Sequence, residues 1–211
     1  FGLACLYFVF GHLSFFIAVS HYIVTPVFFI SEGIALSMII LLGRRVWPGI
    51  FIGQLALAIS TGLGVLPSLI IALINSIEAI LGAALFKRWN IEPGLNSMQH
   101  FGRFVAMIFF ILQPFSATFG TAALYYFDAI QPSQGLFLVW INWWFGNCLG
   151  QFLVAPLLLV LFSSTGGLKN FSRSIASAMW PLISMLPATW LIFGDTVFSG
   201  IALALIIYVP L

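Results

Sequence analysis

Long apolar stretches with almost no charged residues recur along this sequence, and they decide the solvent in which the chain folds. A helix that crosses a bilayer needs about 20 apolar residues, with a range of about 17–25. The 211 residues include only seven Lys and Arg and five Asp and Glu, so 6% of the chain is charged. In a soluble domain, about 25% of the residues are usually charged. These few charged side chains cannot cover a water-facing surface, and the sequence therefore predicts a protein that lies in lipid.

Eight apolar stretches are candidates for transmembrane helices. They cover approximately residues 3–20, 26–42, 46–61, 66–86, 104–127, 135–162, 175–193 and 198–211. We expect residues 96–103 to form an interfacial stretch that leads into the fifth helix. The connections carry glycine, proline and charged residues, which are typical of turns. The sequence thus predicts an all-α fold, a polytopic membrane bundle of about eight transmembrane helices that forms a single domain over residues 1–211.

The distribution of basic residues predicts the orientation of this bundle. With eight helices, three connections on the same side of the membrane hold all the basic residues: Arg44, Arg45, Lys87, Arg88, Arg103, Lys169 and Arg173. The opposite connections hold Asp128 and Asp195 and no Lys or Arg. Cytoplasmic loops carry the excess of Lys and Arg, so the basic side and both termini are predicted to be cytoplasmic. A miscount by one helix would scatter the basic residues over both sides.

Two carboxyl side chains lie within the predicted helices. Glu78 is near the middle of stretch 66–86, and Asn75 precedes it by three residues on the same helix face. Glu32 lies in the outer half of stretch 26–42. Intramembrane carboxyls are candidates for functional groups, because burial in lipid is costly. The structural alternative, a protonated side chain hydrogen-bonded to a neighbouring helix, has about equal weight for Glu78 and more for Glu32.

The segment WINWWFGNCLGQ, residues 140–151, carries two stripes at helical spacing. The first stripe contains Trp140, Trp143 (or Trp144), Asn147 and Gln151, and the second contains Asn142, Gly146 and Gly150. Small residues four apart let two helices approach closely, and Gly49 and Gly53 repeat that spacing in stretch 46–61. The four glycines are therefore predicted to pack helices. Amide side chains such as these three more often form hydrogen bonds between helices than contacts with a ligand. Tryptophans more often pack against neighbouring helices than form a ligand cage.

Patterns typical of enzymes and metal sites are missing from the sequence. It contains no HExxH, GxSxG or P-loop motif. His12 and His21 are nine residues apart on one predicted helix and cannot ligate one iron from opposite faces, while His100 lies in a loop. Cys5 and Cys148 lie in apolar stretches, as packing residues do. We predict no catalytic residue, no metal and no cofactor, and a net charge of +2 gives no reason to expect nucleic acid.

Three segments together resemble the membrane-associated sensor domain of the first MASE type. They are SEGIALSMIILLGRRVWPGIFIGQ at 31–54, ALINSIEAILGAALFKR at 72–88 and WINWWFGNCLGQFLVAPLLLV at 140–160. Their order and spacing match the family as well. The chain departs from the family pattern in two places. Asn147 stands where the family often has Asp, and Ile30, Ser31 and Glu32 stand where it often has a proline-rich run. If that Asp binds a proton or an ion in the family, this chain lacks the charge.

The resemblance implies a sensory input domain of a bacterial inner-membrane signalling protein. Such domains are typically followed by a cytoplasmic histidine kinase or diguanylate cyclase, so we expect an output domain C-terminal to Leu211 and a homodimer. The chain itself is expected not to be an enzyme. A small molecule or a membrane-protein partner would bind a polar pocket and shift the last helix. The candidate residues for that pocket are Glu32, Asn75, Glu78, Asn142, Trp143, Asn147 and Gln151.

Two other functions remain open on the sequence alone. Buried carboxyls near the midplane also suit a small-solute transporter or a substrate-binding membrane component, although no inverted repeat is evident. The bundle could instead be a scaffold that anchors and dimerises an output domain.

Overall fold

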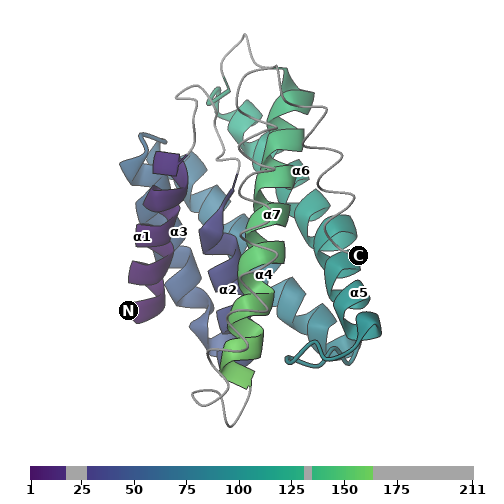
Figure 1. The fold of residues 1–211 in the computed structure, drawn as a ribbon. Helices are drawn as coiled ribbons and strands as arrows, with labels where there is room; N and C mark the ends of the chain where they lie inside the picture. Colours follow the sequence, from purple (N-terminus) through teal and green to yellow (C-terminus); the bar gives the residue numbers. More distant parts are fainter. Residues whose placement is uncertain (18–27, 131–134, 164–211) are drawn as a thin grey trace. The chain divides into compact units, whose positions relative to one another are not determined.

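The computed structural model describes residues 1–17, 28–130 and 135–163, and these residues fold as helices joined by turns (Figure 1). The elements are α1 (Gly2–Ile17), α2 (Ile30–Leu42), the 3-10 turn η1 (Arg44–Val46), α3 (Trp47–Ser60), α4 (Val65–Arg88), α5 (Met98–Met107), the π-helical segment η2 (Ile108–Leu112), α6 (Gln113–Tyr126) and α7 (Leu136–Ser163). They form one compact unit over Phe1–Ser163. The prediction of an all-α fold is confirmed.

Three of the described helical rods are long and apolar enough to cross a bilayer. They are α4, the continuous rod from Met98 to Tyr126, and α7; α1 and α2 are shorter apolar helices. This composition is that of a multi-pass membrane bundle. The predicted stretches 175–193 and 198–211 lie outside the described residues, so the number of eight spans stays a prediction.

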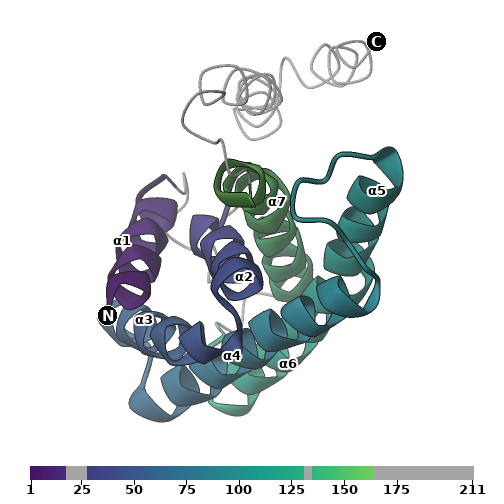
Figure 2. The ribbon, with the colours of Figure 1, turned by 90° about the horizontal axis from the view of Figure 1, so that it is seen from below.

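The short helix α2 occupies the centre of the bundle, with α1, α4 and α7 packed against it (Figure 2). All seven consecutive residues from 31 to 37 are buried. Seven residues make about two turns of helix, so every face of this part of α2 meets protein. A helix buried all round belongs to the core, and here its polar residues must find partners among its neighbours.

The first turn of α2 is docked on glycines of α7. The backbone N–H of Phe29 donates to the carbonyl oxygen of Gly146 at 3.1 Å. A Cβ at Gly150 would collide with the Phe29 carbonyl, and a Cβ at Gly33 would come within 2.6 Å of the Val154 Cβ. The missing side chains therefore allow a hydrogen bond between the backbones of two elements. Because Phe29 is held in this non-helical conformation, α2 begins at Ile30, and the predicted start at residue 26 is wrong.

The second pair of glycines lies against α1. A Cβ at Gly49 would come within 3.2 Å of the Leu3 Cβ, and a Cβ at Gly53 within 2.8 Å of the Tyr7 Cβ. Helix α3 therefore approaches α1 closely along this face. The contact places Tyr7 deep in the bundle, where its side chain is fully buried.

The rod from α5 to α6 contains one π turn, and Pro114 leaves one carbonyl group of this turn without a backbone donor. In η2 the N–H of Gln113 donates to Ile108 instead of to Phe109, as an α-helix would require. In the same π register the partner of the Phe109 carbonyl would be residue 114, and proline has no N–H. The indole N–H of Trp144 donates to the Phe109 carbonyl at 3.1 Å and satisfies it from α7.

The start of this rod also differs from the sequence prediction. The helix begins at Met98, where the Ser97 hydroxyl accepts a hydrogen bond from the backbone N–H of His100 at 3.2 Å. Serine is a strongly preferred N-cap, so the stretch predicted as interfacial, 96–103, is mostly the first turn and a half of α5.

Candidate functional site

The carboxyl group of Glu32, on the central helix α2, is bound by side chains from two other helices. The Tyr7 hydroxyl of α1 donates to Glu32 Oε1 at 2.5 Å, and Asn75 Nδ2 of α4 donates to the same oxygen at 2.9 Å. All three side chains are buried, and Glu32 is 0% exposed. This cluster ties α1, α2 and α4 together inside the membrane bundle.

The second carboxyl group, Glu78 of α4, is bound by two glutamines. Gln113 Nε2 of α6 and Gln151 Nε2 of α7 each donate to Glu78 Oε1 at 2.7 Å. Gln113 is the first residue after the π turn, and Pro114 follows it directly. The local change of helical register therefore helps to aim Gln113 at Glu78. This cluster ties α4, α6 and α7 together.

Both carboxyl groups have only uncharged partners. Within the described ranges the single ion pair is that of His100 and Glu92, 3.8 Å apart in the α4–α5 region, and no Lys or Arg contacts Glu32 or Glu78. Each carboxyl also keeps one buried oxygen, Oε2, without a hydrogen bond in the described chain. A buried carboxyl without a cationic partner depends on its hydrogen-bond donors, so a movement of these donors changes its environment directly.

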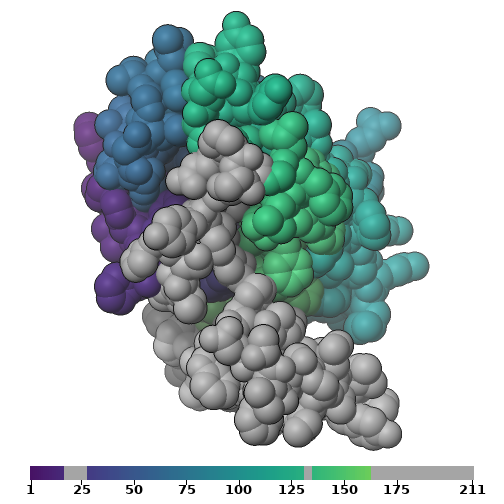
Figure 3. All heavy atoms as spheres, turned by 90° about the horizontal axis from the view of Figure 1, so that it is seen from above, coloured from purple at the N-terminus to yellow at the C-terminus, as the bar shows by residue number. Residues whose placement is uncertain are grey.

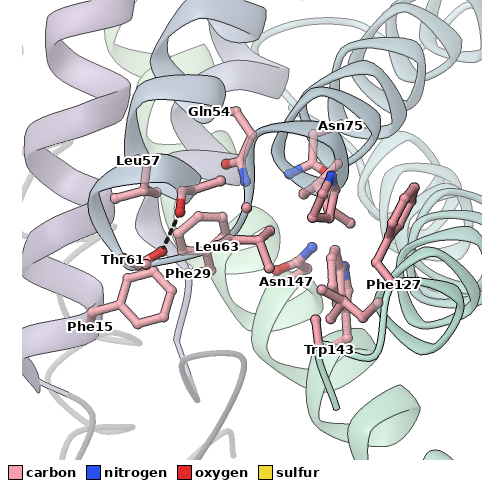
Figure 4. Close-up of a pocket in the computed structure, with 17 residues that line it drawn as sticks. Phe15, Phe29, Gln54, Leu57, Thr61, Leu63, Asn75, Phe127, Trp143 and Asn147 are labelled. Atoms are coloured by element: carbon pink, nitrogen blue, oxygen red, sulfur yellow. Dashed lines mark hydrogen bonds between the residues drawn. The ribbon is translucent and has the colours of Figure 1, made fainter.

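A cavity of about 680 Å³ lies beside these clusters, at the end of the bundle where α3 and α6 end and where α2, α4 and α7 begin (Figure 4). Seen from this end, the α3–α4 region (blue) lies beside the end of α6 and the start of α7 (green) (Figure 3). The cavity is lined by Phe15, Phe29, Gln54, Leu57, Ala58, Thr61, Gly62, Leu63, Gly64, Pro67, Ile71, Asn75, Leu124, Phe127, Ala129, Trp143 and Asn147. Its volume is typical of a site for a small molecule.

Three amide side chains reach this cavity from three helices, Gln54 from α3, Asn75 from α4 and Asn147 from α7 (Figure 4). The carbonyl oxygens of Gln54 and Asn75 are buried and accept no hydrogen bond in the described chain. Asn147 also makes no side-chain hydrogen bond there. Unpaired amides are costly inside a membrane protein, so this cavity has polar groups that a ligand or water can satisfy.

The cavity and the Glu78 cluster are joined by two parallel helical turns. On α4, Asn75 of the cavity stands three residues before Glu78, and on α7, Asn147 stands four residues before Gln151. Residues at these spacings share one helix face. Glu78 and Gln151 then meet directly at 2.7 Å. A displacement of α4 relative to α7 at the cavity therefore changes the geometry of the hydrogen bonds to Glu78.

The structure distributes the residues that the sequence singled out over these three features. Glu32 and Asn75 share the first cluster, Glu78 and Gln151 share the second, and Asn75, Trp143 and Asn147 line the cavity. Asn142 is half-buried on α7 and belongs to none of the three.

The sequence prediction omitted three side chains that complete the site. Tyr7 counts as an aromatic residue in an apolar helix, and Gln54 and Gln113 stand isolated among apolar residues, without the helical spacing that singled out Asn75 and Glu78. Their polar groups within apolar spans are the signal that the sequence offers. It shows which residues need a partner but not which partner they find.

Comparison with a family model decides the class of protein. The MASE1 model matches residues 1–211, the whole chain. This chain belongs to the MASE1 family. Comparisons with curated proteins and with solved structures give no match.

MASE1 domains are membrane sensory input domains of bacterial signalling proteins, among them histidine kinases and diguanylate cyclases. The expectation from the three sequence segments is thereby confirmed, and the sensory hypothesis is favoured over the transporter. The MASE1 domain itself is a non-catalytic sensor embedded in the bilayer. The two buried clusters and the cavity lie within this sensory domain.

Replacing Tyr7 by Phe tests the cluster around Glu32. The variant loses the hydroxyl that donates to Glu32, and we expect the free energy of unfolding to fall by about 1–3 kcal/mol because a buried acceptor is left with fewer donors. Unfolding of the purified protein in mixed micelles measures this change. The matched control is Tyr125→Phe on α6, where the side chain is 62% exposed and little change is expected. Equal stability of both variants would contradict the assigned role of Tyr7.

Proposed function

We propose that the cavity is the place where this MASE1 domain receives its signal. The observation that carries the proposal is the meeting of three incompletely bonded amides, from α3, α4 and α7, in one aromatic-walled space. A ligand that completes their hydrogen bonds has different contacts in different arrangements of these helices. A ligand shifts an equilibrium between two states only by binding one of them more tightly. Such a ligand would therefore favour one arrangement of the helices.

The proposed orientation puts the cavity on the outer side of a bacterial inner membrane. The described helices place Arg44, Arg45, Lys87, Arg88 and Arg103 at the end opposite the cavity. The positive-inside rule makes that basic end cytoplasmic. Together with the two predicted helices beyond α7, this gives eight spans with both termini in the cytoplasm.

The two clusters offer a route from the cavity to the cytoplasmic side. Asn75 contacts both the cavity and Glu32, and Asn147 lies one turn from Gln151, which holds Glu78. A shift of α7 relative to α4 would be passed along α7 toward the last helices of the domain. We propose that the final helix carries this shift to a cytoplasmic histidine kinase or diguanylate cyclase C-terminal to Leu211, within a homodimer.

The orientation is tested by labelling two introduced cysteines in a background in which Cys5 and Cys148 are replaced by Ala. Gly64→Cys, before α4, is predicted to react with a membrane-impermeant maleimide in intact spheroplasts, because it lies at the outer end. Gly102→Cys in α5 is predicted to react only after permeabilisation. A Cβ meets nothing closer than 3.6 Å at Gly64 and nothing within 4 Å at Gly102, so the two sites are a matched pair. The reverse labelling pattern would contradict the proposed topology.

Filling the cavity tests its role as receiver. Ala58 lines the cavity from α3 and is 5% exposed, so Ala58→Phe is expected to occupy part of the space and to fix the output activity of the full-length protein at one level. Ala56→Phe, on the exposed face of the same helix, is the control and should respond as the unmodified protein does. The measurement is kinase or cyclase activity of the full-length protein across growth conditions that change it. An unaltered response in Ala58→Phe would favour the scaffold hypothesis.

A further inference from the structure

We infer that the cavity is built for a neutral small molecule that carries an amide or a similar donor–acceptor group on a planar, apolar body. The inference rests on the proposed role of the cavity and names the chemical class of its ligand. It follows from the charge of the wall, its unused hydrogen-bonding groups and its aromatic surfaces.

The wall of the cavity carries no formal charge. None of the 17 residues that line it is Asp, Glu, Lys, Arg or His. Glu32 is not part of the lining and lies behind Asn75, whose amide nitrogen donates to it. A charged ligand would therefore lose its hydration without meeting an opposite charge on the wall, which is costly in a low-dielectric site. A neutral ligand avoids this cost.

The wall of the cavity holds both hydrogen-bond acceptors and hydrogen-bond donors that are unused. The acceptor is the carbonyl oxygen of Asn147, which bonds no other described residue. Gln54 Oε1 and Asn75 Oδ1 also lack a partner in the described chain, but protein atoms enclose them. The donors are the amide nitrogens of Gln54 and Asn147, which bond no other described residue. The hydroxyl of Thr61 is not free, since it donates to the Ala58 carbonyl at 2.9 Å (Figure 4). A ligand that offers both N–H and C=O groups matches this set.

The rest of the wall is aromatic and aliphatic. Four aromatic side chains face the same space: Phe15 in α1, Phe29 just before α2, Phe127 just after α6 and Trp143 in α7 (Figure 4). The indole N–H of Trp143 already donates to the Ser116 hydroxyl at 3.3 Å, so this side chain offers the cavity only its ring. Aromatic rings pack well against planar apolar groups. The ligand body is therefore expected to be flat and apolar, with its polar group turned toward the amides.

Three probes of nearly equal size separate the ligand classes. Benzamide is neutral and carries an amide, benzoate is an anion and benzylammonium is a cation. Saturation-transfer NMR on the full-length protein in lipid nanodiscs, at neutral pH, measures their relative affinities. We expect benzamide to bind about tenfold more tightly than either ion, the size of effect that one or two net hydrogen bonds produce.

Substitutions of the amides make the test specific to this cavity. Gln54→Leu and Asn147→Leu replace each amide by an apolar side chain of similar size and are expected to weaken benzamide binding about tenfold. Thr121→Val is the control, because Thr121 is also a buried polar residue without a partner in the described chain but does not line the cavity. Gln54→Glu places a carboxylate in the wall and is expected to shift the preference from benzamide to benzylammonium.

The outcomes separate the ligand class from the proposed function. Equal binding of the three probes, tighter binding of an ion, or no binding of any probe overturns the inference of a neutral amide-like ligand. A Gln54→Glu variant that keeps the preference for benzamide overturns it as well, even if the leucine variants fail to fold. The role of the cavity as receiver is judged separately by the response of Ala58→Phe.

Discussion

In a bundle that lies in lipid, a buried carboxyl group can be satisfied only by the protein itself, and this requirement organises the structure. Glu32 draws its donors from α1 and α4, and Glu78 draws its donors from α6 and α7. The two clusters together connect five helices by short hydrogen bonds. Among the described residues, no Lys or Arg contacts either carboxyl group. The positions of the helices and the state of the two carboxyls are therefore coupled.

Features of the backbone bring the donors to the carboxyls. The glycines of α7 let the start of α2 bind directly to the α7 backbone, and this docking holds Glu32 at the centre. The π turn before Pro114 changes the direction of Gln113, and Trp144 satisfies the carbonyl that this turn leaves free. Such local departures from regular helix cost free energy unless a neighbour compensates them, and here α7 does so in both cases.

The sequence predicts the helices of this fold well, because hydropathy alone indicates which stretches lie in lipid. Helical spacing in the sequence also pairs Asn75 with Glu78 and Asn147 with Gln151. It does not predict that Tyr7 and Gln113 complete the clusters, because those contacts join residues 25 and 35 positions apart. It does not predict the start of α2 at Ile30 either, since that depends on glycines in a helix more than a hundred residues away. The cavity arises only from the packing of several helices.

The central claim is that the buried hydrogen-bond clusters form the switch of a MASE1 input domain, and the Glu78→Gln variant of the full-length protein tests it most directly. Glutamine keeps the shape of the side chain and an oxygen that accepts from Gln113 and Gln151, so the bundle is expected to fold. It removes the carboxyl group, so the positions of α4, α6 and α7 can no longer be coupled to the state of that group. The measurement is output activity with and without a change of conditions that alters the unmodified protein. Our account predicts that the variant loses this response. A variant whose output and response both stay unchanged would contradict it.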